Sequence, residues 1–214
     1  MKAYIHPASP NCVAVLALAR ELGAPLATVT VDLFARANNA PEFLSINPNG
    51  LVPVLIDGDF ALWETTAILQ YLATAEGARE WFPDDARGRA DVTRWQAWGL
   101  AHWQPVLQTF IYQNLFKRLR GLGDADPLIV TEALPKLERL AGILEAQLQR
   151  RPWVCGEHAT VADLSLGAYL VYADPAHIPL GNFEHLSLWW SRLRERPAWA
   201  AAQDGVLRLP NRRT

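Results

Sequence analysis

Three short segments in the first 70 residues carry groups that could bind a small polar molecule. The first is Ser9-Pro10-Asn11-Cys12, which lies just before an apolar run. A hydroxyl at a helix start lies beside free backbone N–H groups, where the helix dipole favours negative charge. Ser9 could therefore donate a hydrogen bond to a ligand's thiolate, or it could simply cap the helix, as serine often does. The tetrapeptide alone favours the cap.

The second segment is the run Asn47-Pro48-Asn49-Gly50-Leu51-Val52-Pro53 before an expected strand. Proline is tolerated at the first residue of a strand. The cis form of a bond before proline costs only about 0.5–1 kcal/mol. A cis bond at Pro53 would leave the N–H and C=O of Val52 free to pair with an extended peptide ligand. An ordinary turn into the strand is the alternative.

The third segment is Trp63-Glu64-Thr65, where an acid is followed by a hydroxyl residue that begins a helix. Glu64 offers an anion for an ammonium group. Thr65 and its backbone N–H offer a carboxylate site at a helix N-terminus. Together they suit the α-amino-acid end of a small molecule, and Thr65 can cap the helix at the same time.

Short strands and helices that alternate along the chain position these segments. The hydrophobic pattern predicts strands over residues 2–6, 26–31, 52–56 and 60–63, and helices over 11–22, 41–46 and 65–75. The second strand should pair parallel to the first through a right-handed crossover, and Asp57-Gly58-Asp59 predicts a hairpin. The order β-α-β-(α)-β-β-α matches the thioredoxin fold.

Beyond residue 76 the pattern becomes helical. Residues 87–120 predict a helix bent at Pro105, which removes a backbone donor. Further helices are predicted around residues 137–148, 161–172 and 186–194. We therefore expect an α/β domain over residues 1–78 and an all-helical domain over residues 87–214.

Composition excludes several classes of protein. Half of the 214 residues are hydrophobic and the net charge is -2, so we expect a soluble globular protein with no nucleic-acid partner. No apolar run approaches the roughly 20 residues of a membrane helix, and no signal-peptide core follows Met1. Cys12 and Cys155 are too few for a disulfide framework and lack metal-site spacing. A cytoplasmic protein without a metal is expected.

Taken together, the segments resemble the cytosolic glutathione S-transferases, in particular the bacterial, serine-type members with theta- or zeta-like N-terminal motifs. In the second half, Ala159-Thr160-Val161-Ala162-Asp163 resembles the family's helix capping box, and Arg196-Pro197-Ala198-Trp199 resembles its C-terminal region. The resemblance covers nearly the whole chain. It implies a thioredoxin-like domain followed by an all-α bundle.

The resemblance also implies roles for the residues of the first domain. Ser9 would hydrogen-bond the sulfur of glutathione, the co-substrate. Val52 would pair with the cysteinyl backbone beside a cis Pro53, and Glu64 with Thr65 would hold the γ-glutamyl end. The remaining expected glutathione contacts are Asn11 and Leu51. Family members often have a basic residue near Asn38-Asn39 and a Lys or Gln where Leu51 stands, both of which help to hold the glycyl carboxylate, and both positions are neutral here.

The helix around Trp98 lines the second-substrate pocket in this family, which makes His102 and Trp103 candidates for that pocket. By spacing alone, Trp95, Trp98 and His102 share one face and could be core. Cys12 is interpreted as a small buried hydrophobe.

The implied activity is attack of the glutathione thiolate on a small hydrophobic electrophile, with a role in detoxification. A homodimer is implied too, and the aromatic-rich region from Trp81 to Trp103 favours one. A glutathione-dependent disulfide or peroxide reductase, suggested by Asn11, and a non-catalytic interaction module remain as alternatives.

Overall fold

A four-stranded mixed sheet forms the centre of the N-terminal half. The computed structural model describes residues 1–207. Its strands are β1 (Lys2–Ile5), β2 (Ala27–Thr30), β3 (Val54–Asp57) and β4 (Phe60–Trp63), in the order β2-β1-β3-β4. β2 pairs parallel to β1, whereas β3 pairs antiparallel to both β1 and β4. The predicted order and the parallel pairing are therefore confirmed.

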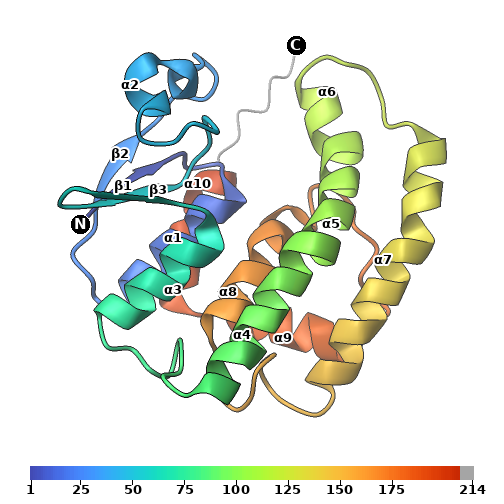
Figure 1. Ribbon diagram of the computed structural model, residues 1–214. Helices are drawn as coiled ribbons and strands as arrows, with labels where there is room; N and C mark the ends of the chain where they lie inside the picture. The colour runs from blue at the N-terminus through green and yellow to red at the C-terminus, as the bar shows by residue number, and fades with distance from the viewer. Residues whose placement is uncertain (208–214) are drawn as a thin grey trace.

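Helices cover both faces of this sheet. α1 (Pro10–Glu21) and α3 (Thr65–Ala75) lie on one face, and the short α2 (Pro41–Leu44), which follows the 3-10 turn η1 (Ala37–Asn39), lies on the other (Figure 1). Alternation along β1 produces this arrangement. Ala3 and Ile5 join the main core with α1, whereas Tyr4 packs with a small cluster of Val31, Phe43 and Val54 that includes a residue of α2.

The predicted third strand starts two residues later than expected. Pro53 has no N–H to give to the ladder, so regular pairing begins at Val54 rather than at Val52. Among residues 1–78 the other expected ends lie within one or two residues, and β4 and α3 match the expectation to the residue. In the second half, the helix expected around residues 137–148 begins earlier, at Pro127.

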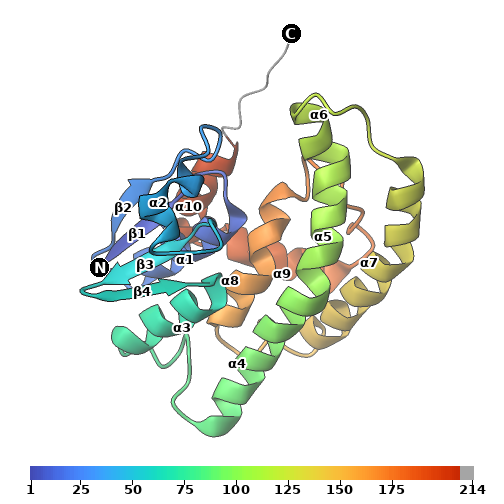
Figure 2. The same ribbon diagram turned by 45° about the horizontal axis from the view of Figure 1, so that its top comes forward.

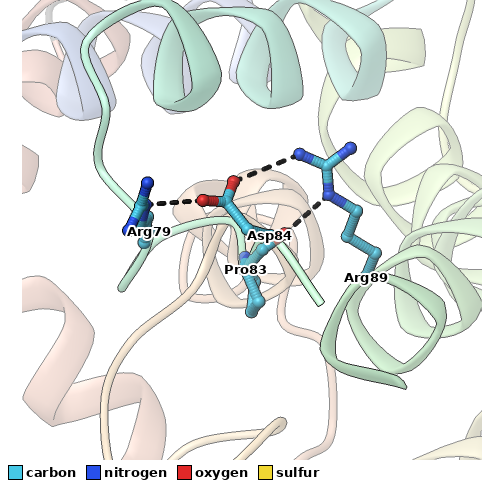
Figure 3. A network of polar contacts seen from close by, with 4 residues as sticks. All are labelled: Arg79, Pro83, Asp84 and Arg89. Carbon is cyan, nitrogen blue, oxygen red and sulfur yellow. Dashed lines mark hydrogen bonds and ion pairs between the residues drawn. The ribbon is translucent and has the colours of Figure 1, made fainter. Parts of the chain in front are cut away.

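Residues 76–85 connect the two halves and are fixed by an ion-pair network. The Asp84 carboxylate contacts the Arg79 Nε at 2.5 Å and the guanidinium of Arg89 at 3.4 Å. Arg89 Nε also donates to the Pro83 carbonyl oxygen at 2.7 Å (Figure 3). Because Arg89 belongs to the next helix, the network attaches the connection to the first turn of that helix.

A long helical column begins the second half. It runs through α4 (Ala86–Trp98), the π-helical turn η2 (Gly99–Trp103), α5 (Gln104–Ile111), a second π-helical turn η3 (Tyr112–Phe116) and α6 (Lys117–Leu119). Pro105 cannot donate to the carbonyl four residues back, and its ring crowds that carbonyl. The backbone instead bonds with five-residue spacing, as from the Gln104 amide to the Gly99 oxygen. The predicted irregularity at Pro105 is therefore a π turn.

The remaining helices complete the bundle (Figure 2). They are α7 (Pro127–Leu148), α8 (Val161–Gly167), α9 (Glu184–Arg194) and α10 (Pro197–Leu207), with a 3-10 turn η4 (Ala168–Tyr172) directly after α8. The helix predicted over 161–172 is thus α8 followed by η4. Residues 208–214, assigned above to the helical domain, lie outside the described residues.

The last helix returns to the first domain and packs along α1. At its N-terminal end, Arg196 forms two hydrogen bonds with the carboxylate of Glu21, at 2.7 and 2.8 Å. At its other end, a Cβ atom on Gly205 would lie 2.7 Å from the Pro7 Cβ. Glycine therefore permits a close approach of α10 to the loop that follows β1.

Candidate functional site

The sheet register places the three chemically interesting segments at one edge. Tyr4 near the end of β1 pairs with Val54 at the start of β3, and Val54 pairs with Trp63 at the end of β4. The loops that continue from these positions must therefore leave the sheet side by side. They carry the predicted site residues Ser9 and Asn11, Val52 and Pro53, and Glu64 and Thr65.

Ser9 caps α1. Its backbone is extended, Pro10 follows at the first helical position, and its Oγ accepts a hydrogen bond from the Cys12 amide at 3.4 Å. The capping interpretation is thus confirmed. The cap itself does not use the hydroxyl's own hydrogen, because Oγ acts in it only as the acceptor. Ser9 can therefore cap α1 and donate to a ligand at the same time.

The loop before Ser9 is held by the helical domain. The hydroxyl of Tyr172, in η4, donates to the carbonyl oxygen of Ala8. Gly205 of α10 lies against Pro7, and the Ala8 amide donates to His6 Nδ1 at 3.2 Å. The position of the Ser9 hydroxyl consequently depends on both halves of the protein.

The cysteines are poor nucleophiles. Burial raises the pKa of the Cys12 thiol to about 11, and its hydrogen-bonding partners Ser9 and His6 only partly oppose this. Burial likewise raises the pKa of Cys155 to about 12, and the negative charge of Asp163 adds to the effect. Because the thiolate is the reactive form, both residues are inert near neutral pH. The interpretation of Cys12 as a buried hydrophobe is confirmed.

The Val52–Pro53 peptide bond is cis, as predicted. Val52 lies outside the regular part of β3, and within residues 1–207 no hydrogen bond involves its N–H or C=O. A backbone donor and acceptor are thus available at the sheet edge, as an extended ligand would require.

Two asparagine side chains hold the loop before Val52. Asn38 Nδ2 donates to the Gly50 carbonyl at 2.8 Å, and Asn47 Nδ2 donates to the Leu51 carbonyl at 2.7 Å. Gly50 has a φ of +62°, and a Cβ there would lie 3.2 Å from the Asn38 carbonyl oxygen. The Leu51 side chain is 62% exposed. Asn38 is therefore already used as a loop anchor.

Glu64 has an unusual backbone conformation. Its φ is +74° and its ψ is 117°, a region that costs a residue other than glycine about 1–3 kcal/mol. Its side chain is exposed and makes no capping hydrogen bond to α3, whereas Thr65 begins that helix and is buried. Strain of this kind concentrates at ligand sites. Glu64 is the residue directly before the first turn of α3, whose N–H groups have no partner within the helix.

Asn11 points toward the helical domain. Its Nδ2 donates to the hydroxyl of Tyr169 at 3.4 Å, and Gln108 Nε2 donates to the same hydroxyl at 2.9 Å. Burial raises the pKa of Tyr169, and the negative charge of Glu64 raises it further. Tyr169 therefore interacts electrostatically with Glu64. Sequence reasoning missed both Tyr169 and Gln108.

The two predicted second-substrate residues have different surroundings. Trp103 is fully buried, and its Nε1 donates to the Leu166 carbonyl at 3.2 Å. Full burial contradicts its assignment to a substrate pocket, because its ring stacks on that of Trp98 in α4 and its indole N–H bonds to α8. His102 is exposed on the same turn, with its ring 6.3 Å from that of Trp98.

A different set of exposed residues on the column includes Gln108, which is linked to the first domain through Tyr169. Gln108 reaches Tyr169, and exposed residues at helical spacing from Gln108 are Ala101, Pro105 and Tyr112. This stripe lies next to the edge that carries Ser9 and Asn11, because Tyr169 contacts both Gln108 and Asn11.

Two further observations concern residues 1–207. No cluster of three or more histidine, cysteine or acidic side chains there could hold a metal ion. In the same part of the chain, the helices are all too short or too polar to span a membrane.

Comparison with known protein families shows which family the chain belongs to. The family model for the glutathione S-transferase N-terminal domain matches residues 1–74, and that for the C-terminal domain matches residues 124–197. The chain belongs to the glutathione S-transferase family. Its predicted fold, a thioredoxin-like domain followed by a helical bundle, is confirmed by glutathione S-transferase structures over nearly the full chain.

Several glutathione S-transferases are similar to this chain in sequence or structure over most of its length. Glutathione S-transferase 3 of Zea mays is 31% identical over 98% of this chain and 95% of its own. Glutathione S-transferase F10 of Arabidopsis thaliana is 32% identical over 84% of this chain and 85% of its own. A theta-class glutathione S-transferase from Xanthomonas axonopodis pv. citri, solved with glutathione bound, superposes with a TM-score of 0.86 at 27% identity, covering 95% of this chain and 96% of that one.

Proposed function

We propose that this glutathione S-transferase family member binds glutathione and transfers its thiolate to a small hydrophobic electrophile. The observation that carries the proposal is the convergence of three loops at one sheet edge. They bring together the Ser9 hydroxyl at a helix N-terminus, the unpaired backbone of Val52 and the strained Glu64. Each suits a different part of a γ-glutamyl tripeptide.

Activation of the thiol is the task of Ser9. A free cysteine thiol has a pKa near 8.5, so only a few per cent is thiolate at pH 7. Each unit by which a pKa falls corresponds to about 1.36 kcal/mol of preference for the anion. A hydrogen bond from Ser9 together with the N-terminal end of α1 supplies about one or two such units. The thiolate then attacks the electrophile while Ser9 remains unmodified.

The remaining parts of glutathione have separate partners. Val52 pairs with the cysteinyl backbone, and Glu64 with Thr65 holds the γ-glutamyl ammonium and carboxylate. For the glycyl carboxylate, Leu51 is apolar and Asn38 anchors Gly50. Arg36 is the basic residue closest in sequence to Asn38 and is exposed at the start of η1.

Replacing Glu64 by glutamine is expected to weaken glutathione binding about tenfold, because the lost charge faced the ligand's ammonium group and an ion-paired hydrogen bond is worth about 1.5–3 kcal/mol. The melting temperature should change little, since the side chain makes no capping bond. Calorimetric titration measures the affinity, and a thermal unfolding scan measures the melting temperature. Glu76→Gln, at the opposite end of α3, is the matched control and should bind as the unaltered protein does. Unchanged affinity of the Glu64 variant together with a fall in stability would contradict the proposed role.

The electrophile would lie between the sheet edge and the helical column. The exposed stripe of Ala101, Pro105 and Tyr112 supplies one wall. Phe34, 77% exposed with its ring 5.6 Å from that of His6, supplies apolar surface beside the Ser9 loop. These mostly apolar surroundings suit a small hydrophobic substrate, as a cytoplasmic detoxifying enzyme would take. The reductase and interaction-module alternatives gain no specific support from these contacts.

We further propose that two copies form a homodimer. The aromatic residues that first favoured it prove to be mostly buried within one chain, including Trp81, Phe82 and Trp95. The support is instead a groove of about 340 Å³ between α4 and α7, whose lining combines the apolar Trp95, Trp98 and Ile143 with the charged Arg94 and Arg150. The Trp95 Nε1 is buried without a hydrogen-bond partner among residues 1–207.

Light scattering at micromolar concentration is expected to give twice the chain mass of 23.8 kDa. Ile143→Arg should shift the mass toward that of one chain, because a third positive charge beside Arg94 and Arg150 resists burial against a second copy. Leu128→Arg, at an exposed site near the other end of α7, should not. A mass of one chain that persists as concentration rises would refute the dimer.

A further inference from the structure

The hydroxyl of Tyr169 has an unusual set of partners. Among residues 1–207, its oxygen accepts two hydrogen bonds, and both donors are side-chain amides. Gln108 Nε2 donates at 2.9 Å and Asn11 Nδ2 at 3.4 Å. A phenol oxygen has lone pairs for such donors and one hydrogen of its own. With two amides donating, that hydrogen is directed away from both of them.

The Tyr169 hydroxyl lies close to the predicted glutathione site. Asn11 lies two residues after Ser9 in the first turn of α1, and Gln108 belongs to the exposed stripe of the helical column. The Tyr169 oxygen lies between the two domains, because it accepts hydrogen bonds from both Asn11 and Gln108. Tyr169 is half-buried in η4, and part of the residue therefore remains accessible. The phenol stays protonated at neutral pH, because burial and the charge of Glu64 both raise its pKa.

We propose that Tyr169 donates a hydrogen bond to an oxygen atom on the electrophile and so makes the enzyme selective for oxygen-bearing substrates such as epoxides. This inference rests on the proposed glutathione transfer. When the thiolate attacks an epoxide carbon, a sulfur–carbon bond forms and the carbon–oxygen bond breaks with its electron pair on oxygen. Tyr169 stabilises that developing alkoxide by hydrogen bonding, and a water molecule then supplies the proton that neutralises it.

Two amide donors make Tyr169 a better hydrogen-bond donor than an isolated phenol. Hydrogen bonds accepted by an oxygen polarise its own O–H bond, so the three interactions strengthen one another. Donors fixed in place before reaction are the ones that stabilise a developing anion effectively. Gln108 and Asn11 act here as positioning residues for the Tyr169 hydroxyl.

Tyr169→Phe tests the proposal with two substrates of similar size. Styrene oxide places an oxygen at the reacting carbon, whereas benzyl chloride has a chloride leaving group and no oxygen. We expect kcat/KM for styrene oxide to fall at least tenfold and that for benzyl chloride to change less than twofold. The KM for glutathione should stay constant. Tyr4→Phe removes a phenol on the opposite face of the sheet, where the ring packs on Phe43, and should affect neither substrate.

The possible outcomes separate this inference from the proposed function. Equal losses with both substrates would show that Tyr169 only holds the domains together, which overturns the inference. An unaltered protein that conjugates benzyl chloride but not styrene oxide would overturn it as well, while leaving glutathione transfer intact. An unaltered protein that conjugates neither substrate would refute both.

Discussion

Replacing Ser9 by alanine is expected to lower kcat about 10- to 100-fold while changing glutathione affinity much less. The hydroxyl donates to the sulfur only once the thiolate forms, and a hydrogen bond to a charged group is worth about 1.5–3 kcal/mol. An interaction that favours the anion over the thiol appears in the rate and in the pKa of the bound thiol. Steady-state turnover with benzyl chloride, combined with calorimetric binding of glutathione, separates the two effects.

The capping role of Ser9 needs its own control. Losing the hydrogen bond from Ser9 Oγ to the Cys12 amide costs about 0.5–2 kcal/mol of stability on general grounds. Asp126→Ala removes a comparable cap from α7, where the carboxylate accepts from the Leu128 amide at 3.0 Å. That variant should lose similar stability and keep its rate. Ser9→Thr retains the hydroxyl and should recover most of the activity. If Asp126→Ala lost as much activity as Ser9→Ala, the effect of Ser9 on the rate would come from helix capping alone.

Replacing Asp163 by alanine is expected to cause the largest loss of stability, about 3–5 kcal/mol. The carboxylate is fully buried and accepts four hydrogen bonds: from the amides of Val154 and Thr160, the Thr160 hydroxyl and Trp189 Nε1. Truncation leaves these donors without their partner in the core, which costs more than the net value of the bonds. It also destroys the capping box with Thr160 that the sequence predicts and the structure confirms.

Thermal unfolding measures this effect. For a chain of this length, the loss corresponds to a fall in melting temperature of roughly 6–20 °C. Glu132→Ala removes an exposed carboxylate on α7 and should change stability by less than about 0.5 kcal/mol. A melting temperature for Asp163→Ala within two degrees of the unaltered protein would contradict the assigned role.

Local signals explain which parts of the fold were predictable. The hairpin turn at Asp57-Gly58-Asp59 and the acid–hydroxyl pair Glu64-Thr65 fix nearby backbone directly, so β4 and α3 match the expectation to the residue. Pro53 forms the expected cis bond, although β3 begins only after it, at Val54. The capping box at Thr160 is equally local. Such features depend on residues only a few positions apart.

Contacts between distant residues explain what the sequence could not predict. Tyr169 meets Asn11 across 158 positions, and Tyr172 meets Ala8 across 164. No pattern in either segment signals these pairs. Trp103 was misplaced for another reason. It was assigned from the resemblance, which places this helix beside the second-substrate pocket, whereas its side chain is fully buried against α8. The electrophile side of the site is built mainly from such contacts.

Ultraviolet titration of glutathione bound to the unaltered protein tests the central claim most directly, because the thiolate absorbs near 240 nm and the thiol does not. The account predicts that the bound thiol has a pKa about one to two units below the value near 8.5 of a free cysteine. A bound thiol that titrates near 8.5, or glutathione that does not bind, would contradict it.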